Sequence, residues 1–175
     1  MEISDAIKNR RSIREYKPDL VEKKIIEDIL YHGSLAPSGH NRQPWYFIVI
    51  EDLELKNTIA ELILEKNGDA GIRTCNAVKQ APALVLVYDR YEYTQGSETM
   101  FDLESIGACL ENMCLKALDY NLGTLWIGLI VNAESEINEL LKTDKKLLAA
   151  LAVGYPSVNP SPRPRDELSE LVEWK

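Results

Sequence analysis

Hydrophobic positions follow two patterns that alternate along the chain. In the first, apolar residues recur every three or four positions, which is the spacing of an amphipathic helix. This pattern predicts helices over residues 2–9, 21–33, 53–65 and about 102–120. In the second, apolar and β-favouring residues form short continuous runs, which are typical of buried strands. These runs predict strands over residues 46–50, 83–88, 124–127 and 147–153, the first of them covered on both faces.

Glycines mark the ends and the small faces of these elements. Gly33 is placed to end the second helix, and Gly68 and Gly71 open a flexible stretch after the third. In the long helix, Gly107 and Ala108 keep one face small. Small residues at that place permit the close approach of another backbone.

The remaining segments lack an apolar period. Residues 36–44 are dense in turn formers and are predicted to be a loop, and residues 89–99 are polar enough for a surface loop. The tail over residues 154–175 holds four prolines and two arginines and is too polar to form a core of its own. We expect such a tail to wrap around a partner subunit.

The alternation of strands and helices predicts an α+β or α/β fold, with a sheet covered by helices on both faces. The chain has 175 residues, of which 45% are hydrophobic, and this is the usual size of one domain with its own core. No internal repeat, low-complexity tract or linker divides it. Residues 1–175 are therefore predicted to form a single domain.

The composition excludes several classes of partner. The formal net charge is −8, whereas nucleic-acid binding depends on a positive field, so no nucleic-acid partner is expected. No apolar run approaches the roughly 18 residues that span a bilayer, and the acidic N-terminus does not resemble a signal peptide. Three cysteines without CxxC spacing suit a reducing compartment, as small core residues rather than disulfides or zinc ligands. A cytoplasmic protein without membrane contact is predicted; the cysteines are Cys75, Cys109 and Cys114.

Basic side chains gather near both ends of this acidic chain. Guanidinium groups bind phosphate bidentately, and a serine hydroxyl can complete such a site. The two groups could converge on one phosphate, or each could be a solvated basic segment. The first group is Arg10, Arg11, Ser12 and Arg14, and the second is Arg163 and Arg165.

Two further segments offer groups for binding. Residues 37–45 carry hydroxyl and amide side chains suited to the polar edge of a heterocycle, and His40 among them is either a general acid or simply solvated. Residues 123–128 place Trp126 and then Gly128 at a strand end, where a ligand ring could touch the backbone. Alternatively, Trp126 is buried and Gly128 only makes the turn.

Motifs of other enzyme classes are missing. The sequence has no Ser-His-Asp arrangement, Walker phosphate loop, GxGxxG or HExxH. Neither a metal site nor a catalytic acid–base pair is predicted.

Taken in order, four of these motifs resemble those of the FMN-dependent nitroreductase family. They are residues 10–14, residues 36–45, residues 123–128, and residues 154–156 together with the two tail arginines. The resemblance covers nearly the whole chain. It implies an α+β nitroreductase-like fold, with a central mixed sheet flanked by helices, in an interlocked homodimer. Each FMN site would be built from both chains, and residues 1–175 would form a single FMN-binding domain.

The resemblance also implies roles for individual residues. Arg10 and Ser12, with Arg11 beside them, would face the phosphate and ribityl chain, and Arg14 would face the pyrimidine edge of the flavin. The tail arginines would clamp the phosphate. Backbone near the flavin N5 would come from Trp126, Ile127 and Gly128. The second subunit would bring Pro37, Ser38, Gly39 and Asn41 to the ring, and Gln43 completes the set of cofactor-binding residues.

The activity implied is that of an oxidoreductase. NADH or NADPH would reduce FMN and leave before a nitroaromatic, quinone or similar small acceptor binds, and the flavin rather than a side chain would carry the chemistry. Alternatives are another reaction on the same fold, either reductive dehalogenation or oxidative flavin chemistry, and a flavin-binding redox module without turnover. A further alternative is a phosphate-ester-binding protein without flavin, which would be colourless. Only about ten residues separate the second strand from the long helix, where relatives often carry a larger insertion over the flavin, so an open site is expected.

Overall fold

The computed structural model of the chain describes residues 2–91 and 97–175, and its centre is a four-stranded sheet. The strands lie in the order β1-β2-β4-β3, and each neighbouring pair is antiparallel. In the register, Ile48 pairs with Leu86, Leu86 with Ala150, and Leu151 with Trp126. The strand bounds are Trp45–Ile50 for β1, Ala83–Asp89 for β2, Gly123–Ile127 for β3 and Leu147–Gly154 for β4.

The α+β class is confirmed, but the sheet is mixed only at its margin. In the described ranges, parallel pairing is confined to an isolated bridge between Ser12 and Thr124. Strands β2 and β3 do point the same way, as strands joined by one helix usually do. However, β4 lies between them and is antiparallel to both. The four strands therefore form an antiparallel sheet, and the expected mixed pairing is corrected to this extent.

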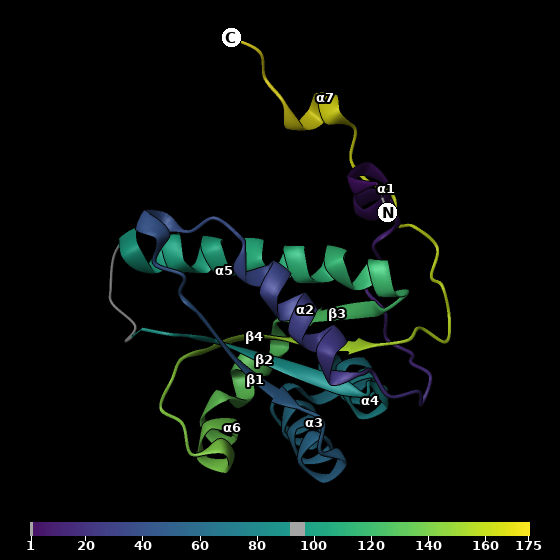
Figure 1. The fold of residues 1–175 in the computed structure, drawn as a ribbon, viewed down its shortest axis with the longest axis vertical. Helices are drawn as coiled ribbons and strands as arrows, with labels where there is room; N and C mark the ends of the chain where they lie inside the picture. The colour runs from purple at the N-terminus through teal and green to yellow at the C-terminus, as the bar shows by residue number, and fades with distance from the viewer. Residues whose placement is uncertain (1, 92–96) are drawn as a thin grey trace.

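Helices cover both faces of the sheet (Figure 1). Two lie on one face, α2 (Lys23–Ser34) and α5 (Ser97–Ala117). Three lie on the other, α3 (Leu53–Asn67), α4 (Ile72–Gln80) and α6 (Glu134–Leu141). Because side chains alternate along a strand, β2 supplies both cores. Its Leu84, Leu86 and Tyr88 pack in the core under α3, α4 and α6, and Val85 and Val87 pack in the core under α2 and α5.

Several predicted elements differ in detail. Strand β1 is an edge strand whose two faces pack against the two cores, as predicted, but the cover is incomplete: Tyr46 is exposed and the middle residues are half-buried. The long helix begins at Ser97, inside the predicted loop; residues 92–96 of that loop lie outside the described residues. Helices α4 and α6 are not predicted at all. Short 3-10 helices fill the connections, over Gly39–Asn41, Gly68–Gly71, Leu118–Tyr120 and Leu129–Ala133.

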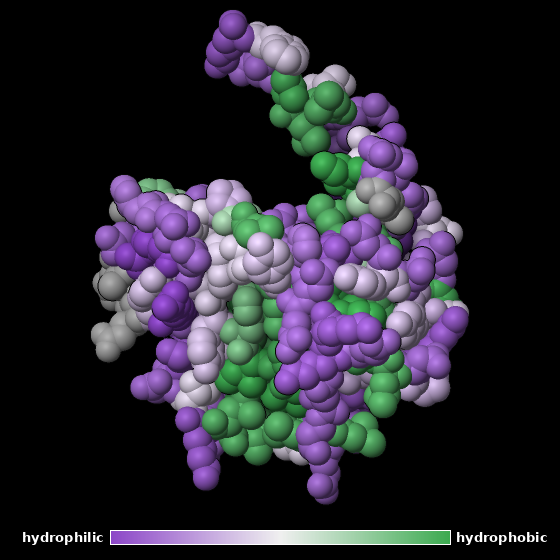
Figure 2. Space-filling view, in the orientation of Figure 1, coloured by the Kyte–Doolittle hydropathy of each residue, from purple (hydrophilic) through white to green (hydrophobic). Residues whose placement is uncertain are grey.

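The C-terminal tail leaves the body of the molecule. It runs past α1 (Ile3–Asn9) and ends after the short α7 (Leu168–Leu171), as Figure 1 shows. Figure 2 shows that the tail arches away from the body and carries apolar side chains. Leu168 is 70% exposed, Leu171 66% and Trp174 91%. No helix in the described ranges is both long and apolar enough to cross a bilayer.

Gly33 allows α2 and α5 to pack closely. The helix does not end at this glycine but continues to Ser34, so the predicted stop is wrong. A Cβ at position 33 would lie 2.5 Å from Met113 Cγ and 3.2 Å from Cys109 Sγ, both on α5. Contacts under 3.0 Å require a shift of one partner, and the absence of a side chain is therefore what lets the two helices approach.

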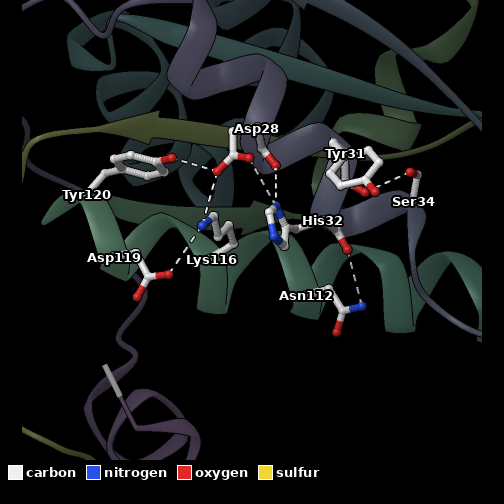
Figure 3. Close-up of polar contacts among 8 residues, drawn as sticks. All are labelled: Asp28, Tyr31, His32, Ser34, Asn112, Lys116, Asp119 and Tyr120. Carbon is white, nitrogen blue, oxygen red and sulfur yellow. Dashed lines mark hydrogen bonds and ion pairs between the residues drawn. The ribbon is translucent and has the colours of Figure 1, made fainter.

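A polar network ties the same two helices together at their solvent edge (Figure 3). Asp28 Oδ2 accepts a hydrogen bond from the Tyr120 hydroxyl at 2.6 Å and lies 3.1 Å from Lys116 Nζ. The Nδ1 atom of His32 is 2.8 Å from the Asp28 carbonyl oxygen, and Lys116 also pairs with Asp119 at 3.3 Å. The hydrogen bonds from Tyr120 and Lys116 lower the pKa of Asp28.

Replacement of Asp28 by Asn should therefore lower stability in a pH-dependent way. A carboxyl whose pKa is lower in the folded chain stabilises the fold above its ordinary value of 3.8, and this contribution is lost as the pH falls through the folded value. We expect Asp28→Asn to melt at a lower temperature than the wild type at pH 7, with a difference that shrinks below about pH 4. Thermal melts from pH 7 to pH 3 measure it, with the exposed neighbour Glu27→Gln as control. A difference that does not change with pH would contradict the assignment.

Candidate functional site

The first arginine group lies on an extended segment that is anchored to the edge of the sheet. Ser12 forms a parallel bridge with Thr124 of β3, and the Ile13 N–H donates to the Thr124 carbonyl at 2.9 Å. Ile13 is buried, whereas Ser12 is exposed and Arg14 half-buried. A Cβ at Gly123 would lie 2.3 Å from Ile13 Cγ1. Gly123 therefore leaves room for the Ile13 side chain and lets the segment lie against β3.

The tail is held beside this segment. The Lys17 N–H donates to the Tyr155 carbonyl at 2.8 Å, and the Ser157 N–H donates to the Glu15 carbonyl at 3.0 Å. Between them, the buried Tyr16 donates its hydroxyl to the Ile13 carbonyl at 3.0 Å, and burial raises its pKa. Residues 15–17 and 155–157 thus run together, and the tail beyond them passes the arginines near the N-terminus.

A cavity of about 590 Å³ lies where the two ends of the chain meet. Its volume falls in the range of about 300–1,000 Å³ that is usual for small-molecule sites. Its wall brings together six residues that the sequence analysis singled out and one that it did not, namely Arg10, Arg11, Ser12, Arg14, Arg163, Arg165 and Arg73. The two basic groups converge, and the alternative of two separate solvated segments is wrong.

The charges in this cavity favour an anion. Burial, and then the nearby Arg73 and Arg163, lower the pKa of Arg14, so its guanidinium lies among like charges. The Nη1 atom of Arg11 donates to the Lys8 and Arg10 carbonyls at 2.7 and 2.8 Å. Its buried Nε has no hydrogen-bond partner among the described residues. Phosphate oxygens would supply acceptors and negative charge to such a donor set.

Sequence reasoning missed Arg73. It lies in the first turn of α4, which itself was missed because the segment is polar and its buried residues are small, Cys75, Ala77 and Val78. Gly68 and Gly71 were interpreted as a flexible stretch. Instead Gly68, with φ of 54°, ends α3, and a Cβ at Gly71 would lie 2.9 Å from the Ile63 carbonyl. A single arginine between unrecognised elements carries no sequence signal of its own.

The loop over residues 37–43 lies elsewhere in the chain and does not line the cavity. A Cβ at Gly39 would lie 3.4 Å from Phe101 Cβ, near the N-terminal end of α5. Arg10 instead pairs with Glu111 at 3.3 Å, ten residues further along that helix. Ten helical residues span about 15 Å. Within one chain, this loop therefore lies apart from the arginines of the cavity (Figure 1). The predicted site residues on the loop are Pro37, Ser38, Gly39, Asn41 and Gln43.

Residues 126–128 lie beside the middle of α5. Trp126 is 43% exposed, so the alternative of a buried tryptophan is wrong. A Cβ at Gly107 would lie 3.7 Å from Trp126 Cη2, which places the small face of α5 next to this ring. Ile127 is buried and can offer a ligand only its backbone, whereas Gly128 is exposed.

The remaining candidate groups are the three cysteines, possible metal ligands and His40. Burial raises the pKa of Cys109 to about 12 and of Cys114 to about 11, which disfavours the thiolate form of both at neutral pH. Cys75 is also buried and free, as expected of a core residue. The described residues contain no cluster of three or more potential metal ligands. His40 is exposed, with a left-handed φ of 51°.

Known proteins resemble this chain over most of its length. A protein of Archaeoglobus fulgidus, assigned as an NADH dehydrogenase/NAD(P)H nitroreductase, is 30% identical over 86% of this chain and 83% of its own. Iodotyrosine deiodinase of Daphnia pulex is 28% identical over 85% of this chain, which spans 57% of that enzyme. The crystal structure of an assigned nitroreductase from Desulfovibrio desulfuricans in complex with FMN is 30% identical, with a TM-score of 0.83 over 100% of this chain and 97% of that one.

The family follows from these comparisons together with the fold. The sequence profile of the Nitroreductase family matches residues 7–155, which include the first arginine group, the loop over residues 37–43 and the exposed Trp126. The two tail arginines lie beyond the matched range, and the structure returns them to the same cavity. The chain belongs to the Nitroreductase family.

Proposed function

We propose that the chain is an FMN-dependent oxidoreductase that takes electrons from NADH or NADPH and reduces nitroaromatics, quinones or similar small acceptors in a ping-pong cycle. The observation that carries the proposal is the cavity where arginines from both ends of the chain meet. The FMN complex of the Desulfovibrio relative and the NAD(P)H named for the Archaeoglobus relative support the cofactor and the donor.

The residues of the cavity fit the phosphate of FMN. The phosphate and the ribityl chain would be bound by Arg10, Ser12, Arg163 and Arg165. A phosphate oxygen could also accept a hydrogen bond from the unpartnered Nε of Arg11. Arg14, with Arg73 close by, would place positive charge at the pyrimidine edge, where a reduced flavin gathers negative charge. Bound FMN would supply hydride acceptance and hydride delivery, so the protein needs only to position donor and acceptor in turn.

The complete site would require two copies of the chain. The loop over residues 37–43 and the arginine cavity lie apart in one copy, and a second copy would bring its own loop to the ring. The exposed apolar side chains of the tail, Leu168, Leu171 and Trp174, support this arrangement, because removal of apolar surface from water against a partner is favourable. Within this homodimer, residues 1–175 would act as a single FMN-binding domain.

A dimer should be evident in solution. Light scattering should give a mass of about 40 kDa, twice the 19.8 kDa of one chain, at micromolar concentration. Exchange of both tail leucines for serine, Leu168→Ser/Leu171→Ser, should weaken the dimer because apolar area is removed from the interface. A matched change on the body, Leu53→Ser, should leave the mass unchanged. A wild-type mass near 20 kDa would contradict the shared site.

Flavin content and turnover test the proposed function. The purified protein should be yellow, with absorbance near ~450 nm from bound oxidised flavin. It should oxidise NADH or NADPH continuously when menadione or a nitrofuran is present. A yellow protein with negligible flux would instead be a redox module without turnover, and colourless protein that takes up no added FMN would reject the proposal.

Reductive dehalogenation is the second candidate. The similarity to iodotyrosine deiodinase over 85% of the chain favours it. The reaction delivers two electrons and a proton to the ring, so that hydrogen replaces iodide. However, only seven residues, 90–96, separate β2 from α5, as the sequence led us to expect. This connection is too short for the larger insertion that relatives often carry over the flavin, which makes dehalogenation the second rather than the first candidate. Iodide release from 3-iodotyrosine, measured beside menadione reduction on the same preparation, distinguishes the two activities.

A further inference from the structure

The loop over residues 37–43, called the polar loop below, has an unusual backbone. His40, Asn41 and Gln43 all have left-handed φ angles, of 51°, 56° and 50°. Residues with a side chain adopt this region rarely, and they keep it only where the surroundings hold them there. Within the loop, the Asn41 N–H donates to the Ser38 carbonyl at 2.9 Å and the Gln43 N–H donates to Ser38 Oγ at 3.0 Å. Contacts outside the loop add to these.

Arg42 supplies the strongest of these contacts. Its Nε donates to Asp102 Oδ1 at 3.1 Å and its Nη2 donates to Asp102 Oδ2 at 3.0 Å, which is the bidentate geometry of a guanidinium–carboxylate pair. Asp102 lies in α5, and its side chain is only 4% exposed. Across the described residues, both recorded hydrogen bonds to this carboxylate come from Arg42. The polar loop is thus tied to α5 through an ion pair whose carboxylate is buried and whose guanidinium is half-buried.

A second side of the same arginine contacts the end of β2. The Tyr91 hydroxyl donates to the Arg42 carbonyl at 2.7 Å, and the Arg42 guanidinium stands 4.8 Å from the centre of the Tyr91 ring. The Tyr91 N–H donates to Asp89 Oδ1 at 3.0 Å. Asp89 is also buried; burial raises its pKa, while Arg42 acts in the opposite direction. The guanidinium therefore lies between the buried Asp102 carboxylate and the face of the Tyr91 ring.

These contacts leave Arg42 little freedom to bind a ligand. Its guanidinium is engaged by Asp102 and Tyr91, and Glu98 lies 3.8 Å from its Nη1. The arginines of the cavity differ, since three of them crowd together and one has an unpartnered nitrogen. What Arg42 fixes is the backbone on either side of it, which belongs to Asn41 and Gln43.

We infer that Arg42 and Asp102 form a clasp that holds the polar loop in the shape that receives the flavin ring, and that Arg42 is a positioning residue for the reaction. The inference rests on the proposed function. Misplacement of a positioning group by about 1 Å can cost about 100-fold in rate. Loss of the clasp should thus lower turnover, while the phosphate site, on different elements, keeps its hold on FMN.

The double variant Arg42→Met/Asp102→Leu separates positioning from mere stabilisation. Arg42→Met alone leaves the buried Asp102 carboxylate without this partner and should destabilise the fold, whereas removal of both charges replaces the pair with apolar contacts. The double variant should therefore regain the melting temperature that Arg42→Met loses. It should still show kcat/KM for menadione reduced by about 10- to 100-fold, with changed visible circular dichroism of the bound flavin. The control is the ion pair of Lys66 and Glu136, whose side chains are 30% and 36% exposed, removed as Lys66→Met/Glu136→Gln.

Hydrogen exchange tests the loop without reference to flavin. Amides of residues 38–43 should exchange faster in the double variant than in the wild type, both measured as purified. Unchanged exchange, or faster exchange with wild-type kcat/KM, would overturn the clasp. If the wild type holds no flavin, the proposed function fails, and the exchange result still decides whether Arg42 and Asp102 order the loop.

Discussion

Replacement of Arg163 or Arg165 by Ala should release FMN from the protein. A hydrogen bond to a charged group contributes about 1.5–3 kcal/mol, and each 1.4 kcal/mol corresponds to a factor of about ten in affinity. Each single variant should therefore bind FMN about 10- to 100-fold more weakly. Both side chains line the cavity but belong to the exposed tail, so their loss should leave the hydrophobic core intact. Flavin fluorescence on titration of the flavin-free protein with FMN measures the change.

The matched control for these variants is Lys175→Ala. It removes the same charge from the same tail, ten residues beyond Arg165, where the side chain pairs only with Glu173 at 3.2 Å in the described structure. FMN affinity should stay at the wild-type value in this variant. If Arg163→Ala and Arg165→Ala also retain wild-type affinity, the tail does not bind the phosphate, and the cavity must be assigned to another ligand.

The fold could be predicted wherever the hydrophobic period was strong. The segments of α2 and α3 carry large apolar residues at helical spacing, those of β2 and β4 are continuous apolar runs, and the structure confirms each of them. Helices α4 and α6 were missed for a physical reason. Their buried positions are few, and in α4 they are small residues whose burial depends on the close approach of α3 at Gly71. Such contacts between elements leave little trace in the local pattern.

The candidate site shows the same division. The two arginine groups were conspicuous because they are basic runs in an acidic chain, and the cavity confirms that they meet. Their convergence depends on hydrogen bonds between residues 15–17 and 155–157, which are backbone contacts that no side-chain pattern encodes. Arg73 and the Arg42–Asp102 pair were missed for a related reason. Each acts through a contact with an element far away in the sequence.

The position of the first arginine group depends on one glycine, and this gives the second large prediction. In Gly123→Ala, the new Cβ would lie 2.3 Å from Ile13 Cγ1 and 3.0 Å from Ile13 Cβ. Ile13 is β-branched and buried, so its side chain has few other positions to adopt, and we expect residues 12–14 to shift away from β3. Overpacking of this kind costs about 1–3 kcal/mol, and each kcal/mol lowers the melting temperature by about 2–4 °C in a chain of this size. FMN binding should weaken as well, because Ser12 and Arg14 move with the segment.

Gly128→Ala is the control for Gly123→Ala. It tests whether the loss of stability comes from the clash with Ile13 or from any added methyl group at the ends of β3. Apart from its two chain neighbours, no atom of the described residues lies within 4 Å of the Cβ that this variant would add, so its melting temperature should equal that of the wild type. Each of the two variants adds one methyl group, Gly123→Ala at the start of β3 and Gly128→Ala directly after its end. Equal melting temperatures for Gly123→Ala and Gly128→Ala would show that Ile13 yields without cost. The anchoring of the arginine segment on β3 would then not be what holds the phosphate site in place.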